Sequence, residues 1–221
     1  MNMSEVNKSE SRNWIQTADG SWTLWIPEVD ETYHSRHGAR QESLHVFIQE
    51  GLHTFQQPSI KVLEVGMGTG LNVLLTLANK KANVQYHALE PYPLTPLLVE
   101  HLINQNPNEA SFYKAVHFSE FDVPVEMNDN FTFIKYMETL ASFNPDIRFD
   151  LIYFDAFGPR VEPDLWTKDA LKKCFDLLNP GGVWVSYCAK GEVRRNLVEV
   201  GFRVERIPGP PGKREMLRAK K

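Results

Sequence analysis

The chain has 221 residues, of which 42% are apolar, and a net charge of −4, which suits one α/β domain with a small N-terminal addition. No apolar run reaches the roughly 18 residues of a membrane helix, and the polar N-terminus lacks an export signal. The two cysteines, Cys174 and Cys188, indicate neither a disulfide framework nor a metal site. We therefore expect a soluble cytoplasmic protein with no metal and no membrane partner.

The N-terminal region predicts a tail followed by a β-hairpin. Residues 1–12 are polar and without periodicity, and are expected to be disordered. The pair Asp19-Gly20 separates two aromatic and β-branched runs at 14–17 and 21–26, a pattern typical of a hairpin.

A helix is expected next, over residues 39–52. Apolar side chains recur there at helical spacing, which predicts one buried face. Glu42 and His45 of this helix could line a site or lie on the surface, and the surface is favoured for each because single polar side chains are mostly exposed.

The stretch 61–75 carries the strongest motif in the chain. A short aliphatic strand leads to glycines at alternate positions, and a helix-forming run follows. Such glycines let the backbone approach a ligand closely, and the N-terminus of the helix presents free N–H groups to it. The motif predicts a nucleoside-bearing cofactor, with a purely structural turn as the alternative.

Glycine spacing distinguishes between cofactors. Dinucleotide sites use G-x-G-x-x-G, whereas Gly66, Gly68 and Gly70 form G-x-G-x-G. The acid Glu64 at the end of the strand would repel a pyrophosphate and suits the cationic end of S-adenosylmethionine. The pattern resembles the first motif of class I methyltransferases, and we expect these four residues and Asn72 to bind that cofactor.

The second strand is expected over 84–89 and ends at Glu90. An acid about twenty residues beyond the glycines is placed to accept hydrogen bonds from ribose hydroxyls. A helix over 93–102 and a third strand over 131–136 follow, whereas 105–130 shows no clear pattern.

The fourth strand, expected over 149–154, ends at Asp155. Ligands of doubly wound sheets lie outside the carboxyl ends of the strands, so Asp155 should face the same crevice as Glu64 and Glu90. This placement suits a catalytic carboxylate; a residue that merely caps the loop is the alternative.

The C-terminal part completes a doubly wound, mostly parallel sheet. We expect a helix over 163–178, a strand over 183–187, a helix over 192–200 and two closing strands at 202–207 and 215–218. One strand of the closing pair should be antiparallel.

The segment from Lys190 to Lys221 is basic. It holds ten Lys or Arg against four Glu, a net charge of +6, which leaves −10 for the rest of the chain. A basic segment on an acidic body is a candidate nucleic-acid surface, with an ordinary solvated surface as the alternative.

Several motifs together resemble the methyltransferase family of the wobble-uridine tRNA modification pathway. They are YHSRHGARQESLHVF at 33–47, GMGTGLN at 66–72, LEPYPL at 89–94, FDAFGPRVEPDLW at 154–166, EVRRNLVEVGF at 192–202 and KREML at 213–217. The ordered series D-A-F-x-P, P-D-x-W, V-R-R and K-R-E-M is more specific than the glycines. The resemblance implies a class I, Rossmann-like methyltransferase domain over 59–221, preceded by a hairpin and helix extension over 13–58.

The resemblance also implies an activity. The family uses S-adenosylmethionine to methylate the 5-aminomethyl group of uridine 34 in tRNA, which completes 5-methylaminomethyl-2-thiouridine. An aliphatic amine is mostly protonated at neutral pH, so Asp155 is expected to act as its base or to position it. The expected partners are the anticodon loop of tRNA and a separate FAD-dependent oxidase acting upstream, because in many bacteria the two enzymes are fused and this chain resembles the stand-alone methyltransferase.

Residues that bind tRNA are expected in the C-terminal half. Basic side chains hold the phosphates of an anticodon loop, and aromatic rings stack on its bases. The candidates are Phe157, Pro159, Tyr187, Lys190, Arg194, Arg195, Lys213 and Arg214. Packing or a surface ion pair is the alternative for each.

One position departs from the family pattern. The family carries a Gly-Asp pair after the third strand, where the acid holds adenine, whereas this chain has Lys135 and Tyr136. Either Glu138 takes that role or Tyr136 stacks on the base, and the sequence leaves both open.

Other classes of function remain open at this point. A methyltransferase or aminopropyltransferase that acts on a small-molecule amine would use the same fold. A non-catalytic binding module could keep the fold as a scaffold, and a dinucleotide oxidoreductase is disfavoured by the glycine spacing.

Overall fold

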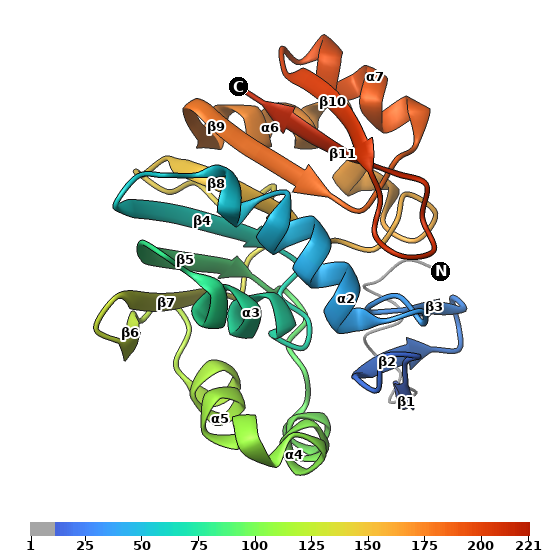
Figure 1. Ribbon diagram of the computed structural model, residues 1–221, viewed down its shortest axis with the longest axis vertical. Coiled ribbons are helices and arrows are strands. Elements are labelled where there is room, and N and C mark those ends of the chain that lie inside the picture. Colours follow the sequence, from blue (N-terminus) through green and yellow to red (C-terminus); the bar gives the residue numbers. More distant parts are fainter. Residues whose placement is uncertain (1–11) are drawn as a thin grey trace.

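Residues 12–221 are described by the computed structural model, and within this range the chain forms a small and a large β-sheet (Figure 1). The strands of the small sheet are β1 (Asn13–Gln16), β2 (Trp22–Ile26) and β3 (Glu31–Thr32). Those of the large sheet are β4 (Ser59–Val65), β5 (Asn83–Leu89), β6 (Val125–Asn128), β7 (Phe131–Tyr136), β8 (Phe149–Phe154), β9 (Leu178–Ser186), β10 (Arg203–Pro208) and β11 (Glu215–Lys220). The tail predicted over 1–12 lies outside the described residues, apart from Arg12.

Strand β4 lies in the middle of the large sheet. The strand order is β10-β11-β9-β8-β4-β5-β7-β6, and the strands from β7 through β5, β4 and β8 to β9 are parallel. Strand β11 lies antiparallel between β9 and β10. The predicted doubly wound, mostly parallel sheet with an antiparallel C-terminal strand is therefore confirmed, and the antiparallel edge strand β6 is an addition to it.

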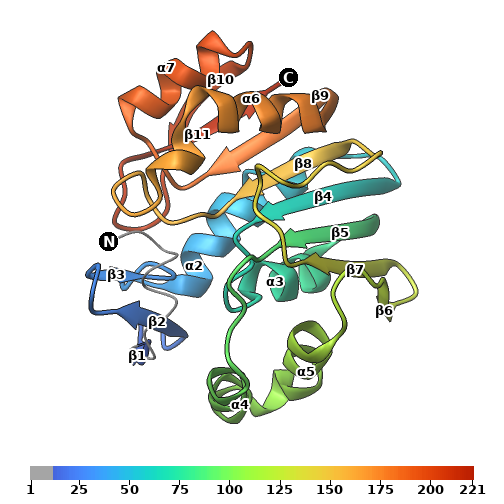
Figure 2. The same cartoon turned by 180° about the vertical axis from the view of Figure 1, so that it is seen from behind.

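Helices cover both faces of this sheet. They are α2 (Ala39–Ser43), which continues as a π-helical segment (Leu44–Gln49), α3 (Leu71–Asn79), α4 (Pro96–Gln105), α5 (Ala110–Phe118), α6 (Lys168–Leu177) and α7 (Gly191–Glu199), with short 3-10 turns at Leu52–Thr54, Pro107–Glu109 and Pro163–Trp166. Helices α2 and α3 lie on one face (Figure 1), and α6 and α7 lie on the other (Figure 2). In the described part of the chain, no helix has the length and apolar character to span a bilayer.

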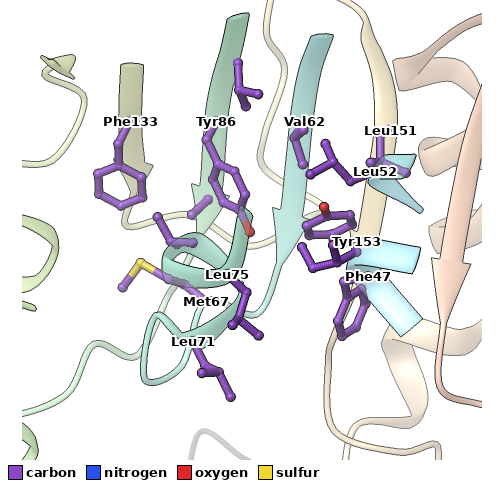
Figure 3. Close-up of a cluster of buried hydrophobic side chains, with 14 of the residues drawn as sticks. Phe47, Leu52, Val62, Met67, Leu71, Leu75, Tyr86, Phe133, Leu151 and Tyr153 are labelled. Carbon is purple, nitrogen blue, oxygen red and sulfur yellow. The ribbon is translucent and has the colours of Figure 1, made fainter. Parts of the chain in front are cut away.

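The large sheet has one main apolar cluster on each face, because side chains alternate along a strand, and two smaller clusters involve the small sheet. On β4, Val62 belongs to the cluster beneath α2 and α3, and Leu63 to the cluster beneath α6 and α7. Figure 3 shows the first cluster, in which the ring of Tyr153 lies 5.0 Å from that of Phe47 and 6.0 Å from that of Tyr86. Burial on both faces explains why neighbouring residues of β4, Val62 and Leu63, are both apolar instead of alternating with polar residues.

Local capping signals determine where two of the helices begin. The helix predicted over 93–102 starts later, at Pro96, because Thr95 accepts a hydrogen bond from Leu98 N and proline suits the first helical position. Thr167 caps α6 in the same way. The few residues that form each cap therefore determine where the helix begins.

The helix expected over 163–178 begins as the 3-10 turn Pro163–Trp166, and β9 begins at Leu178, before the strand expected over 183–187. Two other regions also differ from the sequence-based expectation. The helix predicted over 39–52 ends at Gln49, in a π-helical turn. The region 105–130, for which no prediction was possible, contains α5 and β6. Helix α5 is rich in aromatic and β-branched residues with low helix propensity, and it is stabilised by packing in the first core cluster. The side chains that pack there are Phe112, Tyr113 and Val116.

The small sheet lies beyond the carboxyl ends of β4, β5 and β8 (Figures 1 and 2). The predicted hairpin is confirmed, and Asp19 stabilises its turn by accepting a 3.1 Å hydrogen bond from Ser21 N. Arg160, in the loop after β8, joins the small sheet to the large one through a 2.9 Å ion pair with Glu31. The proposed domain boundary after residue 58 stays a prediction.

Candidate functional site

A cavity of about 860 Å³ lies at the carboxyl ends of the central strands, next to the small sheet. Such a volume is typical of small-molecule sites. Acidic side chains predominate in its wall: Glu31, Glu42, Glu90, Glu138, Asp155, Glu162, Asp164 and Asp169, against Lys173 and Lys213. Burial lowers the pKa of the remaining basic side chain, His34, to about 4 and keeps it neutral. The wall therefore suits a cationic ligand.

The glycine turn after β4 forms part of this wall. Gly66 and Gly68 have φ angles of 90° and 54°, in the region that favours glycine. A Cβ on Gly66 would lie 2.8 Å from the carbonyl oxygen of Asp155, and one on Gly68 would lie 3.0 Å from the ring of Tyr33. The two glycines thus let the turn pack closely against the end of β8 and against Tyr33, and the backbone of this turn, the glycine cradle, lines the cavity.

Glu90 braces the turn from the end of β5. Its Oε2 accepts a 2.7 Å hydrogen bond from Gly68 N, and its Oε1 accepts a 2.9 Å bond from Tyr92 N. Burial raises the pKa of Glu90, and the two N–H donors oppose that effect. Glu90 therefore holds the glycine turn in shape and also lines the cavity.

Beneath the turn, Asn72 bridges two carboxyl groups. Its Nδ2 donates 2.8 Å hydrogen bonds to Glu64 Oε1 and to Asp155 Oδ2. Tyr86 donates a 2.9 Å bond to the other oxygen of Glu64. Burial, followed by the charge of Asp155, raises the pKa of Glu64 well above its ordinary value. Glu64 and Asn72 are fully buried and do not line the cavity, and Gly70 faces α5 instead.

Asp155 lines the cavity where β8 ends. Burial raises the pKa of its carboxyl group to about 7, and the charge of Glu42 acts in the same direction. The hydrogen bond from Asn72 and the charge of Lys213 lower it. Asp155 can therefore exchange a proton near neutral pH, as a general base requires.

Glu42, on α2, also lines the cavity, so the less favoured of its two expected positions is the one observed. Its side chain is 12% exposed, and its Oε2 lies 2.5 Å from Lys213 Nζ. The ammonium of Lys213 in turn lies 4.1 Å from the ring centroid of Tyr187. His45 lies away from the cavity wall and pairs with the carbonyl of Pro208 at 2.9 Å. The partner of Glu42 is far away in sequence, which is why helical spacing alone did not reveal this role.

Two further side chains of the wall were missed by sequence reasoning. Glu162 accepts a 3.0 Å hydrogen bond from Phe157 N, and burial together with the charge of Glu90 raises its pKa to about 7. Tyr33 packs edge-on against Phe157, with ring centroids 5.1 Å apart. Tyr33 lies inside the motif at 33–47 and Glu162 inside the motif at 154–166, so these two motifs were the sequence pattern that pointed to them.

The candidates for tRNA contact divide into two groups. Phe157, Tyr187 and Lys213 line the cavity, whereas Pro159 does not. The other basic candidates lie outside the cavity wall and are exposed to solvent; they are Lys190, Arg194, Arg195 and Arg214.

The structure distinguishes the two candidates for the adenine end. Glu138 lines the cavity. Tyr136 does not, because its ring stacks on His87 at 5.8 Å and its hydroxyl forms a 2.9 Å hydrogen bond with His87 Nδ1. Lys135 is buried and donates to the carbonyl oxygens of Val116 and His117, at the end of α5.

Helix α5 supports the glycine turn from outside. His117 Nε2 donates a 3.0 Å hydrogen bond to the carbonyl oxygen of Thr69, within the turn. Burial lowers the pKa of His117 to about 4, so the ring is neutral and its proton lies on Nε2. Lys135 and His117 thus connect β7, α5 and the turn.

The strand order, the glycine cradle and the acids at the strand ends define a class I enzyme that binds S-adenosylmethionine. The glycine cradle that lines the cavity and the excess of carboxylates in the wall both fit this cationic cofactor. The chain belongs to the S-adenosyl-L-methionine-dependent methyltransferase family, whose model matches residues 96–221.

The relatives are named for the tRNA modification pathway that the sequence motifs suggest. The chain is 27% identical over 212 residues to the tRNA 5-methylaminomethyl-2-thiouridine biosynthesis bifunctional protein MnmC of Pseudomonas entomophila, covering 86% of the chain and 32% of that protein. The MnmC of Hydrogenovibrio crunogenus is 30% identical over 209 residues, covering 85% and 31%. The chain thus spans about a third of the length of these relatives.

Solved structures agree with the fold. The crystal structure of MnmC2 from Aquifex aeolicus matches with a TM-score of 0.73 and 26% identity, covering 96% of the chain and 71% of that protein. Spermidine synthase from Thermotoga maritima matches with a TM-score of 0.56 and 16% identity, covering 96% and 69%. The latter similarity concerns the fold alone. The resemblance to the wobble-uridine methyltransferase family and the expected cofactor are confirmed.

Proposed function

We propose that this methyltransferase acts on the amino group of 5-aminomethyl-(2-thio)uridine at position 34 of tRNA and forms 5-methylaminomethyl-(2-thio)uridine. The names of the relatives support the tRNA substrate. The observation that carries the chemistry is the carboxyl group of Asp155, which lines the cavity and has a pKa raised to about 7.

The cofactor would be held by residues at the strand ends. S-adenosylmethionine supplies, when bound, an electrophilic methyl group on a sulfonium. Gly66 and Gly68 provide the backbone cradle, Glu90 is proposed to accept hydrogen bonds from the ribose, and Glu138 to contact adenine. We propose that Glu64, Asn72 and Gly70, which lie outside the cavity wall, contribute by fixing the shape of this cradle. Direct contact of these three residues with the cofactor stays a prediction.

Asp155 would remove a proton from the ammonium group of the acceptor. An aliphatic amine has an ordinary pKa of about 10, so it arrives as an ammonium that has no free lone pair. The ionised carboxyl group of Asp155 accepts a hydrogen bond from this ammonium, orients it and takes up a proton as the amine becomes nucleophilic. A carboxyl group whose pKa lies near the working pH can then release that proton to solvent.

Binding of tRNA would use the outer rim of the cavity. The exposed side chains of Lys190, Arg194, Arg195 and Arg214 are proposed to contact phosphates, which adds salt-dependent affinity. Phe157 and Tyr187 are proposed to stack on the wobble base, with Pro159 nearby in sequence. The proposal also includes an FAD-dependent oxidase that forms the amine, and a cytoplasmic location for both steps.

The test is conversion of a defined nucleoside. The protein is incubated with labelled S-adenosylmethionine and tRNA from a strain that lacks this methylation, and the tRNA is digested to nucleosides. We expect the aminomethyl nucleoside to become the methylaminomethyl nucleoside. Absence of conversion by folded protein that binds the cofactor contradicts the proposal, and label transfer to small amines instead would establish the small-molecule alternative.

A further inference from the structure

A loop from the C-terminal hairpin closes one side of the cavity. It joins β10 to β11 and lies beside α2 (Figure 1). A Cβ on Gly212 would lie 3.1 Å from the ring of His37, and Pro208 accepts a hydrogen bond from His45. The loop is therefore packed against the segment around α2, and it directs Lys213 into the cavity wall.

Within that wall, Glu42 and Lys213 form an ion pair in a fixed place. Glu42 Oε1 accepts a 3.3 Å hydrogen bond from Ser35 N, and Oε2 lies 2.5 Å from Lys213 Nζ. The ammonium also lies over the ring of Tyr187, whose hydroxyl donates a 2.8 Å bond to the carbonyl of Ala156. Because Ala156 follows Asp155, the pair sits on the side of the cavity that contains the catalytic candidate.

The pair acts on Asp155 in two opposing ways. The charge of Glu42 raises the pKa of the Asp155 carboxyl group, and the charge of Lys213 lowers it. The other titratable groups near the pair or its loop are His34, whose ring burial keeps neutral, and His37, Cys188, Tyr187, Glu31 and Arg214, the last of which follows Lys213 in the sequence. Burial raises the pKa of Cys188 and Tyr187, so both remain protonated at neutral pH.

An amine that reaches Asp155 meets the same two charges. A wall with Glu42 and Asp155 alone would present two carboxylates, which favour the protonated and unreactive ammonium. The ammonium of Lys213 compensates one of these charges. Removal of Lys213 would leave the negative charge of Glu42 uncompensated beside the acceptor amine, and removal of Glu42 would leave the positive charge of Lys213.

We propose that Glu42 and Lys213 form an internal charge pair that sets the proton affinity of Asp155 and of the acceptor amine, with Lys213 favouring the unprotonated amine. The amine part of this inference rests on the proposed function. Lys213 then acts on the reaction through Asp155 and the amine as a positioning residue, instead of holding a tRNA phosphate.

The test uses opposite charge changes at the two positions. Lys213→Met should move the pH midpoint of kcat/KM upward by about one unit, and Glu42→Gln should move it downward by about one unit. Both substitutions together should restore a midpoint close to that of the unaltered enzyme. Glu50→Gln is the matched control, because Glu50 pairs with Arg218 outside the cavity and should leave the midpoint unchanged.

A second measurement separates this proposal from the proposed function. Carbon-13 NMR of the Asp155 carboxyl group follows its titration directly, without tRNA. Midpoints that move in opposite directions in the two single variants support the charge pair, whether or not tRNA is methylated. Absence of tRNA methylation alone overturns only the proposed function. Uniform loss of activity at every pH, with an unmoved Asp155 midpoint in correctly folded variants, overturns the charge pair.

Discussion

Asn72 Nδ2 donates a 2.8 Å hydrogen bond to Asp155 Oδ2, across 83 positions of the sequence. The same nitrogen donates to Glu64, so the first helix after the glycine turn holds the acid that ends β8 in a fixed orientation. A general base must be oriented as well as basic, and Asn72 supplies that orientation from beneath the cavity.

Asp155→Asn should lower kcat by about a hundredfold or more, since general-base catalysis contributes about 10² to 10⁴ in rate. The amide keeps the shape of the side chain and can still accept the hydrogen bond from Asn72. Affinity for S-adenosylmethionine, measured by calorimetry, should change only slightly. Equal losses in turnover and cofactor affinity would indicate a structural role instead.

The contribution of Asp155 and Glu162 to the stability of the unliganded protein should fall as pH rises from about 4 to about 7. Burial raises the pKa of Asp155 from 3.8 to about 7 and that of Glu162 from 4.5 to about 7. The folded state therefore holds these protons more tightly than the unfolded state, and their stabilising effect is lost as pH passes the folded pKa.

The same relation predicts how a neutral variant behaves. Asp155→Asn lacks the buried charge, so its melting temperature relative to the unaltered protein should rise between pH 5 and pH 8. Scanning calorimetry at several pH values measures this difference. A difference that stays constant with pH would contradict the raised pKa of Asp155.

Gly66→Ala should reduce affinity for S-adenosylmethionine by about ten- to a hundredfold, because the new Cβ meets the backbone of Asp155 at 2.8 Å and φ is 90°. The matched control is Gly181→Ala, whose φ is 78° but whose Cβ meets nothing within 4 Å. The control bears similar backbone strain and should keep its affinity. Equal losses in both variants would assign the effect to strain alone.

Replacement of Arg194 and Arg195 by Gln should weaken tRNA binding and make it less sensitive to salt. Each lost phosphate contact should lower the slope of log K against log salt by about 0.7. Lys81→Gln is the control, because this exposed lysine precedes the amino end of β5, whereas the cavity lies at the carboxyl ends of the strands. An unchanged slope in the double variant would remove these arginines from the proposed tRNA surface.

The sequence predicted the sheet and its crevice well, for a simple geometric reason. The carboxyl ends of parallel strands meet at one edge, so the acids that end β5 and β8 had to approach each other. Both Glu90 and Asp155 line the cavity. Strand ends are local features, and the aliphatic runs that form the strands are visible without any tertiary information.

Other parts of the site depend on contacts that no local pattern contains. Glu42 lies in the cavity wall because a loop 171 residues later brings Lys213 to it. Asn72 and Glu64 lie beneath the wall, where Asn72 Nδ2 donates a hydrogen bond to Glu64, although the glycine motif alone suggests that they lie next to a ligand. Burial of such polar side chains is decided by their partners.

Helix α5 has a consequence for the dynamics of the glycine turn. His117 ties this helix to Thr69, and Lys135 caps its last carbonyl groups. Order in the turn and order in α5 are thus thermodynamically linked, and linkage is reciprocal. A ligand that immobilises the turn should slow amide hydrogen exchange along α5, so a helix outside the cavity would report on occupancy of the cofactor site.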